Sequence, residues 1–190
     1  MPRRQVNFAP EHYYHLFNRG NDRQNIFFER ENYLYFLRQF QHYLVEDTLA
    51  VLAYCLMPNH YHFLVCLRSH HLSEHMQAFS LSYTKAINRR CGRCGSLFQG
   101  RFRAIGVDSD RYLLHLTRYI HLNPVKAGFV ECPEDWEFSS YREYVDLRQG
   151  KLPKLEAIRQ EMGTARDYPA FVSAADMPTR PKLSHLMFDE

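Results

Sequence analysis

Two histidines stand one residue apart in the segment MPNHYHFLV, residues 57–65, which otherwise has the composition of a buried strand. Because successive side chains of a strand point to opposite faces, His60 and His62 share one face, with Cα atoms about 7 Å apart, while Tyr61 and Phe63 take the other. Two imidazoles at this spacing can converge on one metal ion. Eleven histidines in 190 residues give about 0.6 such pairs by composition alone. The spacing by itself therefore leaves a ligand pair and two unrelated histidines as alternatives.

A second group of candidate residues lies in LTRYIHLNPVKAG, residues 116–128. At positions i and i+4 of a helix, Tyr119 and Asn123 share one face, and His115 lies one turn earlier. A tyrosine on an amphipathic helix is more often a residue at the edge of the core with its hydroxyl hydrogen-bonded. Helical periodicity alone therefore assigns Tyr119 no function.

The five cysteines are an odd number at irregular positions, which favours free thiols over a disulfide framework. Cys91 and Cys94 form a C-x-x-C pair without a matching second half. A zinc site would need two further ligands at suitable spacing, and His70, His71 and His75 offer no standard pattern. We therefore expect these cysteines to bind no metal.

The net charge of +3 is unevenly distributed along the chain. Between residues 48 and 107 the only acid is Glu74, whereas residues 131–146 are rich in Asp and Glu. Cations interleaved with aromatic rings are typical of a surface for a phosphate-bearing polymer, and a solvated basic surface is the alternative. The basic residues of the first stretch are Arg68, Lys85, Arg89, Arg90, Arg93, Arg101 and Arg103.

The elements that must position these side chains follow from alternation, helical spacing and breaker residues. Ser73 is expected to cap the second helix and Ser109 or Asp110 the third, which Pro124 and Gly128 should end. Strands are predicted at 14–20, 50–57, 60–67 and in a segment ending near 108, and helices at 31–45, 72–90 and 109–123.

The resulting order β-α-β-β-α-β-α predicts the α+β class with the ferredoxin-like split βαβ arrangement, an antiparallel sheet with two helices on one face. The helix that carries Tyr119 is an addition to this arrangement. Residues 1–146 are expected to form one domain and residues 147–190 a partly helical, partly mobile extension. From about residue 138 onward, the segments FSSYREYVD and LEAIRQEM predict short helices, and RQGKLPK predicts a linker between them. The stretch with Pro178 and Pro181 predicts an extended or mobile end.

A hydrophobic content of 45% is ample for a packed core. The segment MPRRQVNFAP lacks the apolar region of a secretory signal, and the longest apolar run, VLAYCLM, is too short to span a bilayer. We therefore expect a soluble, cytoplasmic protein without a membrane partner.

Four segments in this order, LMPNHYHFLV, GSLFQGRFRA, RYLLHLTRYIHLNPVKAGFV and WEFSSYREY, resemble the motifs of REP-associated tyrosine transposases, relatives of the single-tyrosine HUH insertion-sequence transposases. The resemblance runs from about residue 14 to residue 144. It implies that His60 and His62 bind a divalent metal, that Tyr119 is the nucleophile, and that Asn123 completes the metal site. Related insertion-sequence enzymes usually carry glutamine at the position of Asn123, and the CGRC segment departs from the family.

The resemblance also implies a metal-dependent endonuclease and strand transferase for single-stranded hairpin DNA. Because a phenol has a pKa of about 10, Mg²⁺ or Mn²⁺ would have to polarise the scissile phosphate. Attack by Tyr119 would then give a 5′-phosphotyrosine and a free 3′-hydroxyl, and the covalent bond would allow resealing without ATP.

Two other functions stay open: a non-catalytic nucleic-acid-binding module on the same fold, and a metal-dependent phosphodiesterase that uses water. Since insertion-sequence relatives act as dimers and REP-associated members can be monomers, we expect a monomer or a weak homodimer. Cations are expected to contact the DNA backbone and two phenylalanines to stack on bases. The expected DNA-binding residues are Lys85, Arg89, Arg90, Arg93, Phe98, Arg101, Phe102 and Arg103.

Overall fold

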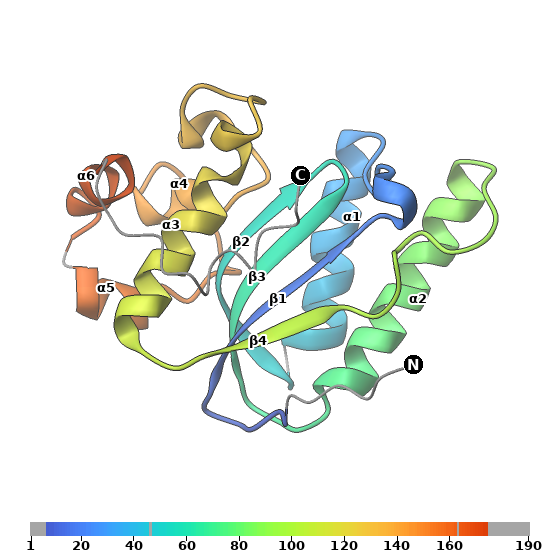
Figure 1. Cartoon of the computed structure of the whole chain (residues 1–190), viewed down its shortest axis with the longest axis horizontal. Helices are drawn as coiled ribbons and strands as arrows, with labels where there is room; N and C mark the ends of the chain where they lie inside the picture. Colours follow the sequence, from blue (N-terminus) through green and yellow to red (C-terminus); the bar gives the residue numbers. More distant parts are fainter. Residues whose placement is uncertain (1–6, 46, 163, 175–190) are drawn as a thin grey trace.

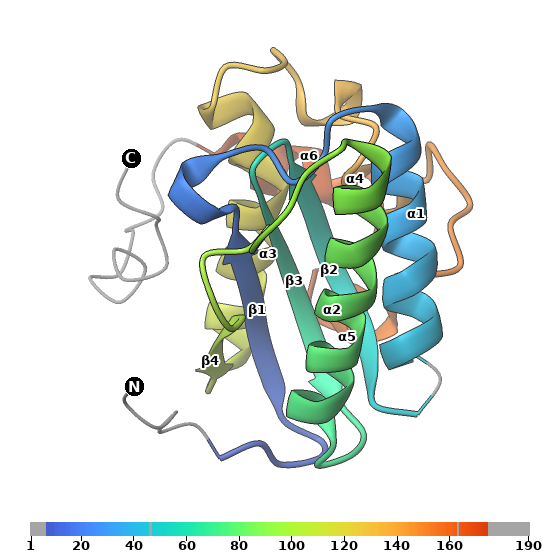
Figure 2. The same ribbon diagram turned by 90° about the vertical axis from the view of Figure 1, so that its right-hand side faces the viewer.

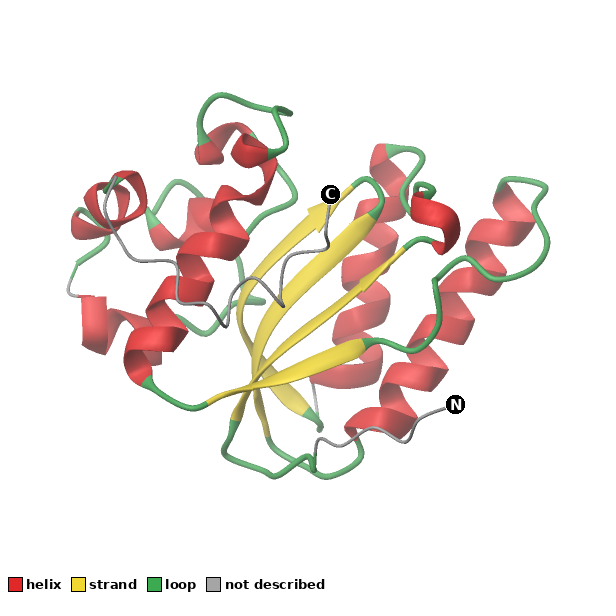
Figure 3. Ribbon diagram, in the orientation of Figure 1, coloured by secondary structure: helices red, strands yellow, loops and turns green. Residues whose placement is uncertain are grey.

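A four-stranded antiparallel sheet forms the centre of the protein (Figures 1 and 3). The computed structural model describes residues 7–45, 47–162 and 164–174. The strand order β2-β3-β1-β4 places β1 and β3 in the middle, and the element order confirms the predicted α+β class with its split βαβ arrangement. The strands are β1 (Tyr13–Arg19), β2 (Leu49–Met57), β3 (His60–Leu67) and β4 (Arg103–Val107).

Helices cover both faces of the sheet (Figure 2). One face carries α1 (Arg30–Phe40) and α2 (Leu72–Arg90), and the opposite face carries α3 (Asp110–Lys126). A π-helical turn, Gln41–Val45, continues α1, so helical structure reaches Val45 as predicted. Among the described residues, no helix is long and apolar enough to cross a membrane.

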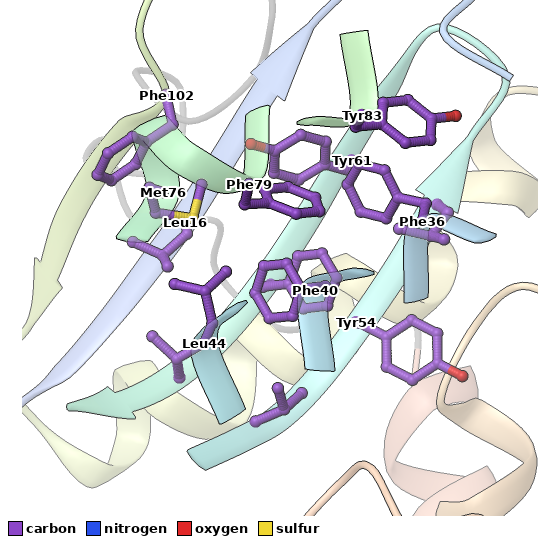
Figure 4. Packing of buried hydrophobic residues seen from close by; sticks show 14 of the residues in the cluster. Leu16, Phe36, Phe40, Leu44, Tyr54, Tyr61, Met76, Phe79, Tyr83 and Phe102 are labelled. Atoms are coloured by element: carbon purple, nitrogen blue, oxygen red, sulfur yellow. The ribbon is translucent and has the colours of Figure 1, made fainter. Parts of the chain in front are cut away.

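The core between the sheet and α1 and α2 consists largely of aromatic rings (Figure 4). Phe40 of α1 stacks on Phe63 of β3 with ring centroids 4.0 Å apart, and Phe36 meets Phe79 of α2 edge-on at 4.9 Å. Tyr61 lies in the same core, 5.2 Å from Phe36. The odd-numbered residues of β3 therefore point toward α1 and α2, as the alternation predicted, and leave the opposite face to the two histidines.

A second core lies between the sheet and α3. It includes residues of α4 (Tyr141–Tyr144), α5 (Glu156–Met162) and α6 (Asp167–Ser173). The helices at α4 and α5 were predicted, whereas α6 was not. Since α5 and α6 pack on α3, the described part of the C-terminal extension shares this core, and the domain division at residue 146 stays a prediction.

Three predictions about helix ends need comment. Ser73 lies inside α2, whose N-cap is His71 without a side-chain cap bond, because the helix already begins at Leu72. Ser109 does cap α3 by accepting from the Tyr112 N–H. Pro124 does not end α3, because it lies in the final turn, where its missing N–H removes one helical bond only.

Two further predictions concern the C-terminal third. RQGKLPK is a connecting segment without helix or strand, as predicted, and it lies against the sheet, since the Lys154 N–H donates to the Val51 carbonyl of β2 at 2.8 Å. The stretch with Pro178 and Pro181 lies outside the described residues.

Candidate active site

The two histidines of β3 lie on the sheet face that α3 covers. His60 pairs with Arg19 and Met57 in the ladders, and His62 pairs with Phe17 and Cys55, so both stand between two neighbouring strands. Their ring centroids are 5.1 Å apart and their planes meet at 79°. His62 is fully buried, whereas His60 is partly exposed.

α3 brings Tyr119 and Asn123 to these histidines. The ring of Tyr119 meets that of His62 edge-on, with centroids 5.5 Å apart, and Asn123 Oδ1 lies 3.4 Å from His60 Nε2. The i, i+4 face of the helix therefore lies against the histidine face of the strand. The ring of His115, one turn earlier, lies 6.3 Å from that of Phe171 of α6.

Hydrogen bonds on the far side of each ring orient the histidines. Asn59 Nδ2 donates to the Arg23 carbonyl at 3.3 Å, which identifies Asn59 Oδ1 as the atom 2.7 Å from His60 Nδ1. An amide oxygen can only accept, so in the neutral ring His60 Nδ1 carries the proton and Nε2 keeps its lone pair. His62 Nδ1 lies 2.8 Å from Nε2 of His15.

His15, on β1, is a residue of this site that sequence reasoning missed. It is fully buried, and its ring lies 5.0 Å from that of His62 and 6.4 Å from that of Tyr119. The signal in the sequence was an ionisable residue in the middle of the apolar run YYHLFNR. Only the strand pairing shows that this residue faces the histidine pair.

The three imidazoles are neutral at pH 7 because burial opposes their charged forms. Burial lowers the pKa of His60 to about 4 and that of His15 to about 3. Burial, helped by the neighbouring His15 and His60, lowers the pKa of His62 well below its usual value. Neutral imidazoles are the form that binds metal ions.

The donor atoms of this site fit a divalent cation. Asn123 Nδ2 donates to the Tyr119 carbonyl at 3.1 Å, so Asn123 presents its oxygen to the lone pair of His60 Nε2, 3.4 Å away. Two acceptors that face each other repel, and a cation between them removes the repulsion. Among the described residues, no group of three or more His, Cys, Asp or Glu side chains could hold a metal ion. Binding would therefore depend on His60, His62 and the Asn123 amide.

Cationic side chains of the described residues lie around this face of the sheet. Arg19 and Arg103 stand opposite His60 and Phe17 in the strand ladders, so they share the face of the histidines. Lys126 Nζ lies 5.5 Å from the ring centroid of Tyr119. Sequence reasoning had included Arg103 among the DNA contacts and had missed the other two.

The remaining predicted DNA contacts do not form one surface with the site. Lys85, Arg89 and Arg90 belong to α2, on the opposite side of the sheet. Arg93 follows α2 and donates to Gln24 Oε1 at 2.6 Å. Arg101 is exposed in the loop before β4. The predicted basic zone is thus divided between two faces, because α2 packs on the face away from α3.

Phe98 and Phe102 are core residues. They are 5% and 7% exposed, Phe98 meets Tyr61 edge-on at 6.1 Å, and Phe102 belongs to the core under α2 (Figure 4). Burial leaves neither ring face open for a base, so we exclude both from the proposed interface. Cys91 and Cys94 are exposed free thiols.

Comparison with known proteins identifies the family of this chain. The family described as "Transposase IS200 like" matches residues 9–123. The chain is 29% identical over 103 residues to the "REP-associated tyrosine transposase" of Escherichia coli strain K12, covering 53% of this chain and 58% of that protein. It is 29% identical over 113 residues to the "Putative REP-associated tyrosine transposase" of Haemophilus influenzae, covering 53% and 61%. The matches therefore span about six-tenths of the length of these curated relatives.

A solved structure shares the fold. It is titled "Structure of the REP associates tyrosine transposase bound to a REP hairpin" and superposes with a TM-score of 0.66 at 20% identity. The match covers 83% of this chain and 96% of that one. At this level of identity the likeness concerns the fold alone.

Proposed function

Since this chain belongs to the IS200-like transposase family, we propose that it cleaves and joins single-stranded DNA at hairpins, with Tyr119 as the nucleophile. The observation that carries the proposal is that α3 holds Tyr119 within 5.5 Å of the His62 ring and Asn123 Oδ1 within 3.4 Å of His60 Nε2. The names of the relatives and the hairpin bound by the structural neighbour support the substrate.

His60, His62 and Asn123 are the residues that would hold a divalent cation, Mg²⁺ or Mn²⁺. When bound, the cation supplies Lewis-acid chemistry, polarising the scissile phosphate and neutralising charge that develops on its oxygens. Two neutral nitrogens and one amide oxygen leave its positive charge undiminished and leave room for phosphate oxygens. Oxygen ligands from the substrate favour Mg²⁺ or Mn²⁺.

Tyr119 performs the covalent step. Its phenolic oxygen forms a bond to phosphorus as the bond from phosphorus to the 3′-oxygen breaks, and its proton passes to solvent while the departing 3′-oxygen takes one up. The products are a 5′-phosphotyrosine and a free 3′-hydroxyl. Attack by another 3′-hydroxyl on the phosphotyrosine reverses the exchange and joins strands without ATP.

Hairpin single-stranded DNA labelled at its 5′ or 3′ end and incubated with Mn²⁺ tests the proposal. Denaturing electrophoresis should show a covalent adduct with wild type and none with Tyr119→Phe, which keeps DNA binding because only the attacking oxygen is removed. Tyr112→Phe, on the same helix and buried, is the matched control and should keep the adduct.

The same experiment separates the alternatives. Binding without cleavage would support a non-catalytic module, and cleavage without an adduct would support a phosphodiesterase that uses water. An adduct that survives Tyr119→Phe would overturn the assignment of the nucleophile. We further propose a monomer or weak homodimer in the cytoplasm, and analytical ultracentrifugation with and without DNA tests the oligomeric state.

A further inference from the structure

A buried hydrogen bond joins His62 to His15 of the neighbouring strand. His15 Nε2 and His62 Nδ1 are 2.8 Å apart, and the rings are nearly parallel, with an interplanar angle of 21°. Both side chains have no exposed surface. The ring of Phe17 stacks on that of His15 at 4.7 Å. The ring of Tyr119, on α3, meets both imidazoles edge-on.

A hydrogen bond between two neutral imidazoles has one donor and one acceptor, so this pair has two arrangements. If His15 Nε2 carries a proton, it donates a hydrogen bond to His62 Nδ1. The single proton of the neutral His62 ring is then on its Nε2. If His62 Nδ1 carries the proton and His15 accepts, His62 Nε2 keeps a lone pair. Only the second arrangement lets His62 Nε2 bind a metal ion.

We propose that His15 is a positioning residue: with the cation bound, its Nε2 accepts a hydrogen bond from the His62 Nδ1–H and holds His62 in the tautomer whose Nε2 binds the metal. The inference rests on the metal site of the proposed function and extends it to a residue outside the ligand set. Asn59 has the same relation to His60, since its Oδ1 accepts from Nδ1 at 2.7 Å. His60 and His62 would thus each donate their Nδ1–H to an acceptor on the side away from the metal, as metal-binding histidines commonly do.

The metal-binding arrangement has a consequence for the His15 ring. His15 Nδ1 is a buried atom that makes no hydrogen bond within the described part of the chain, and in the metal-binding arrangement it carries a proton. Binding of the cation must therefore outweigh one buried donor without an acceptor. This predicts that the cation changes the tautomer populations of both rings, which is measurable.

Substitutions at His15 separate a hydrogen-bonding role from a packing role. His15→Phe keeps a ring of similar size and removes the acceptor, and it should weaken Mn²⁺ binding by about 10- to 100-fold. His15→Gln places an amide oxygen near the position of Nε2 and should restore most of the affinity. Phe17→Leu is the control, because it alters the packing beside His15 without removing a hydrogen bond.

The measurements are Mn²⁺ titration calorimetry on the full chain and nitrogen-detected tautomer assignment of ¹⁵N-labelled histidines with and without Mg²⁺. The inference expects His62 as the Nδ1–H tautomer with the cation bound and the affinity order wild type, Gln, Phe. A folded His15→Phe that binds Mn²⁺ like wild type would overturn it, as would a His62 proton on Nε2 in the cation-bound wild type.

The wild type itself distinguishes this inference from the function on which it rests. If wild type forms the Tyr119 adduct and binds Mn²⁺, but the His15 variants bind Mn²⁺ as tightly as wild type, then only the proposed role of His15 fails. If wild type binds no Mn²⁺, the metal site and the role of His15 both fail. Should His15→Phe not fold, the Gln variant and the wild-type tautomer decide.

Discussion

The three side chains proposed to hold the cation each have a hydrogen-bond partner on the side that faces away from it. Asn59 holds His60, His15 holds His62, and the Tyr119 carbonyl holds Asn123 through its Nδ2. These bonds determine which atom of each group is available: a lone pair on His60 and an oxygen on Asn123. The proposed chemistry therefore also depends on Asn59 and His15, which belong to neither the proposed ligand set nor the nucleophile.

Removal of either histidine of the proposed metal site should abolish cleavage. His60→Ala should weaken Mn²⁺ binding and leave the fold intact, because His60 is partly exposed. His62→Ala should also destabilise the fold by about 1–3 kcal/mol, since it leaves His15 Nε2 buried without a partner. Calorimetric metal titration, thermal unfolding and DNA cleavage measure these effects. Unchanged cleavage in the double variant, or in excess chelator, would contradict the site.

The carboxyl of Glu29 should report on whether Arg90 is available to DNA. Hydrogen bonds from Arg90 lower the pKa of Glu29 below 4.5. A lowered carboxyl pKa stabilises the fold above the ordinary pKa, and the effect is lost as pH falls through the lowered value. Arg90→Gln should return the pKa toward 4.5 in an NMR titration, whereas Arg89→Gln, a neighbouring exposed residue, should leave it unchanged. Equal pKa values in both variants would contradict the pairing.

At the scale of elements, α3 links the sheet to the C-terminal helices. One face carries Tyr119 to the histidines, and another carries His121, whose Nδ1 lies 2.6 Å from the Tyr168 hydroxyl of α6. His121 Nε2 lies 2.7 Å from the Ser140 hydroxyl beside α4. Arg118 donates to the Val172 carbonyl at the end of α6. The position of the nucleophile is thus supported by elements later in the chain.

Breaking this support should loosen α6. His121→Leu leaves the hydroxyls of Ser140 and Tyr168 without one of their partners in a buried place, which should lower the free energy of unfolding by about 1–3 kcal/mol. Tyr168→Phe removes one hydroxyl of the pair and should cost less. Chemical denaturation gives the energies, and hydrogen exchange should show faster exchange in α6. Protection equal to wild type in His121→Leu would contradict a supporting role.

At the scale of the whole molecule, the two sheet faces have different tasks. One face packs its aromatic core against α1 and α2, and the face under α3 carries the polar groups with Arg19, Arg103 and Lys126 around them. In the acidic segment 131–146, ion pairs neutralise three of the carboxylates. Glu137 pairs with Arg30, Glu143 with Arg148 and Asp146 with Arg159.

This division predicts which cations contact DNA. Arg103→Gln, on the site face, should lower the slope of log K against log salt by about 0.7 for a single strand. Lys85→Gln and Arg89→Gln, on α2, are controls and should leave the slope unchanged. Fluorescence anisotropy with labelled hairpin DNA at several salt concentrations measures it. A slope lowered only by the α2 variants would place the DNA on the opposite face.

The sequence by itself determined the local geometry of the candidate residues. Strand alternation places His60 and His62 on one face of β3, and helical spacing places Tyr119 and Asn123 on one face of α3. The element order was enough for the fold class, because short connections between alternating strands and helices leave few arrangements. These properties depend on neighbours a few residues apart, which the sequence shows directly.

Only the tertiary structure decided which faces meet. β3 and α3 are separated by more than forty residues of sequence (67 to 110), and no local pattern says which sheet face a helix will cover. His15 joins the site through the pairing of β1 with β3, and Phe98 and Phe102 leave the proposed interface through packing under α2. Burial and register result from contacts between distant segments, so neither could be obtained from spacing alone.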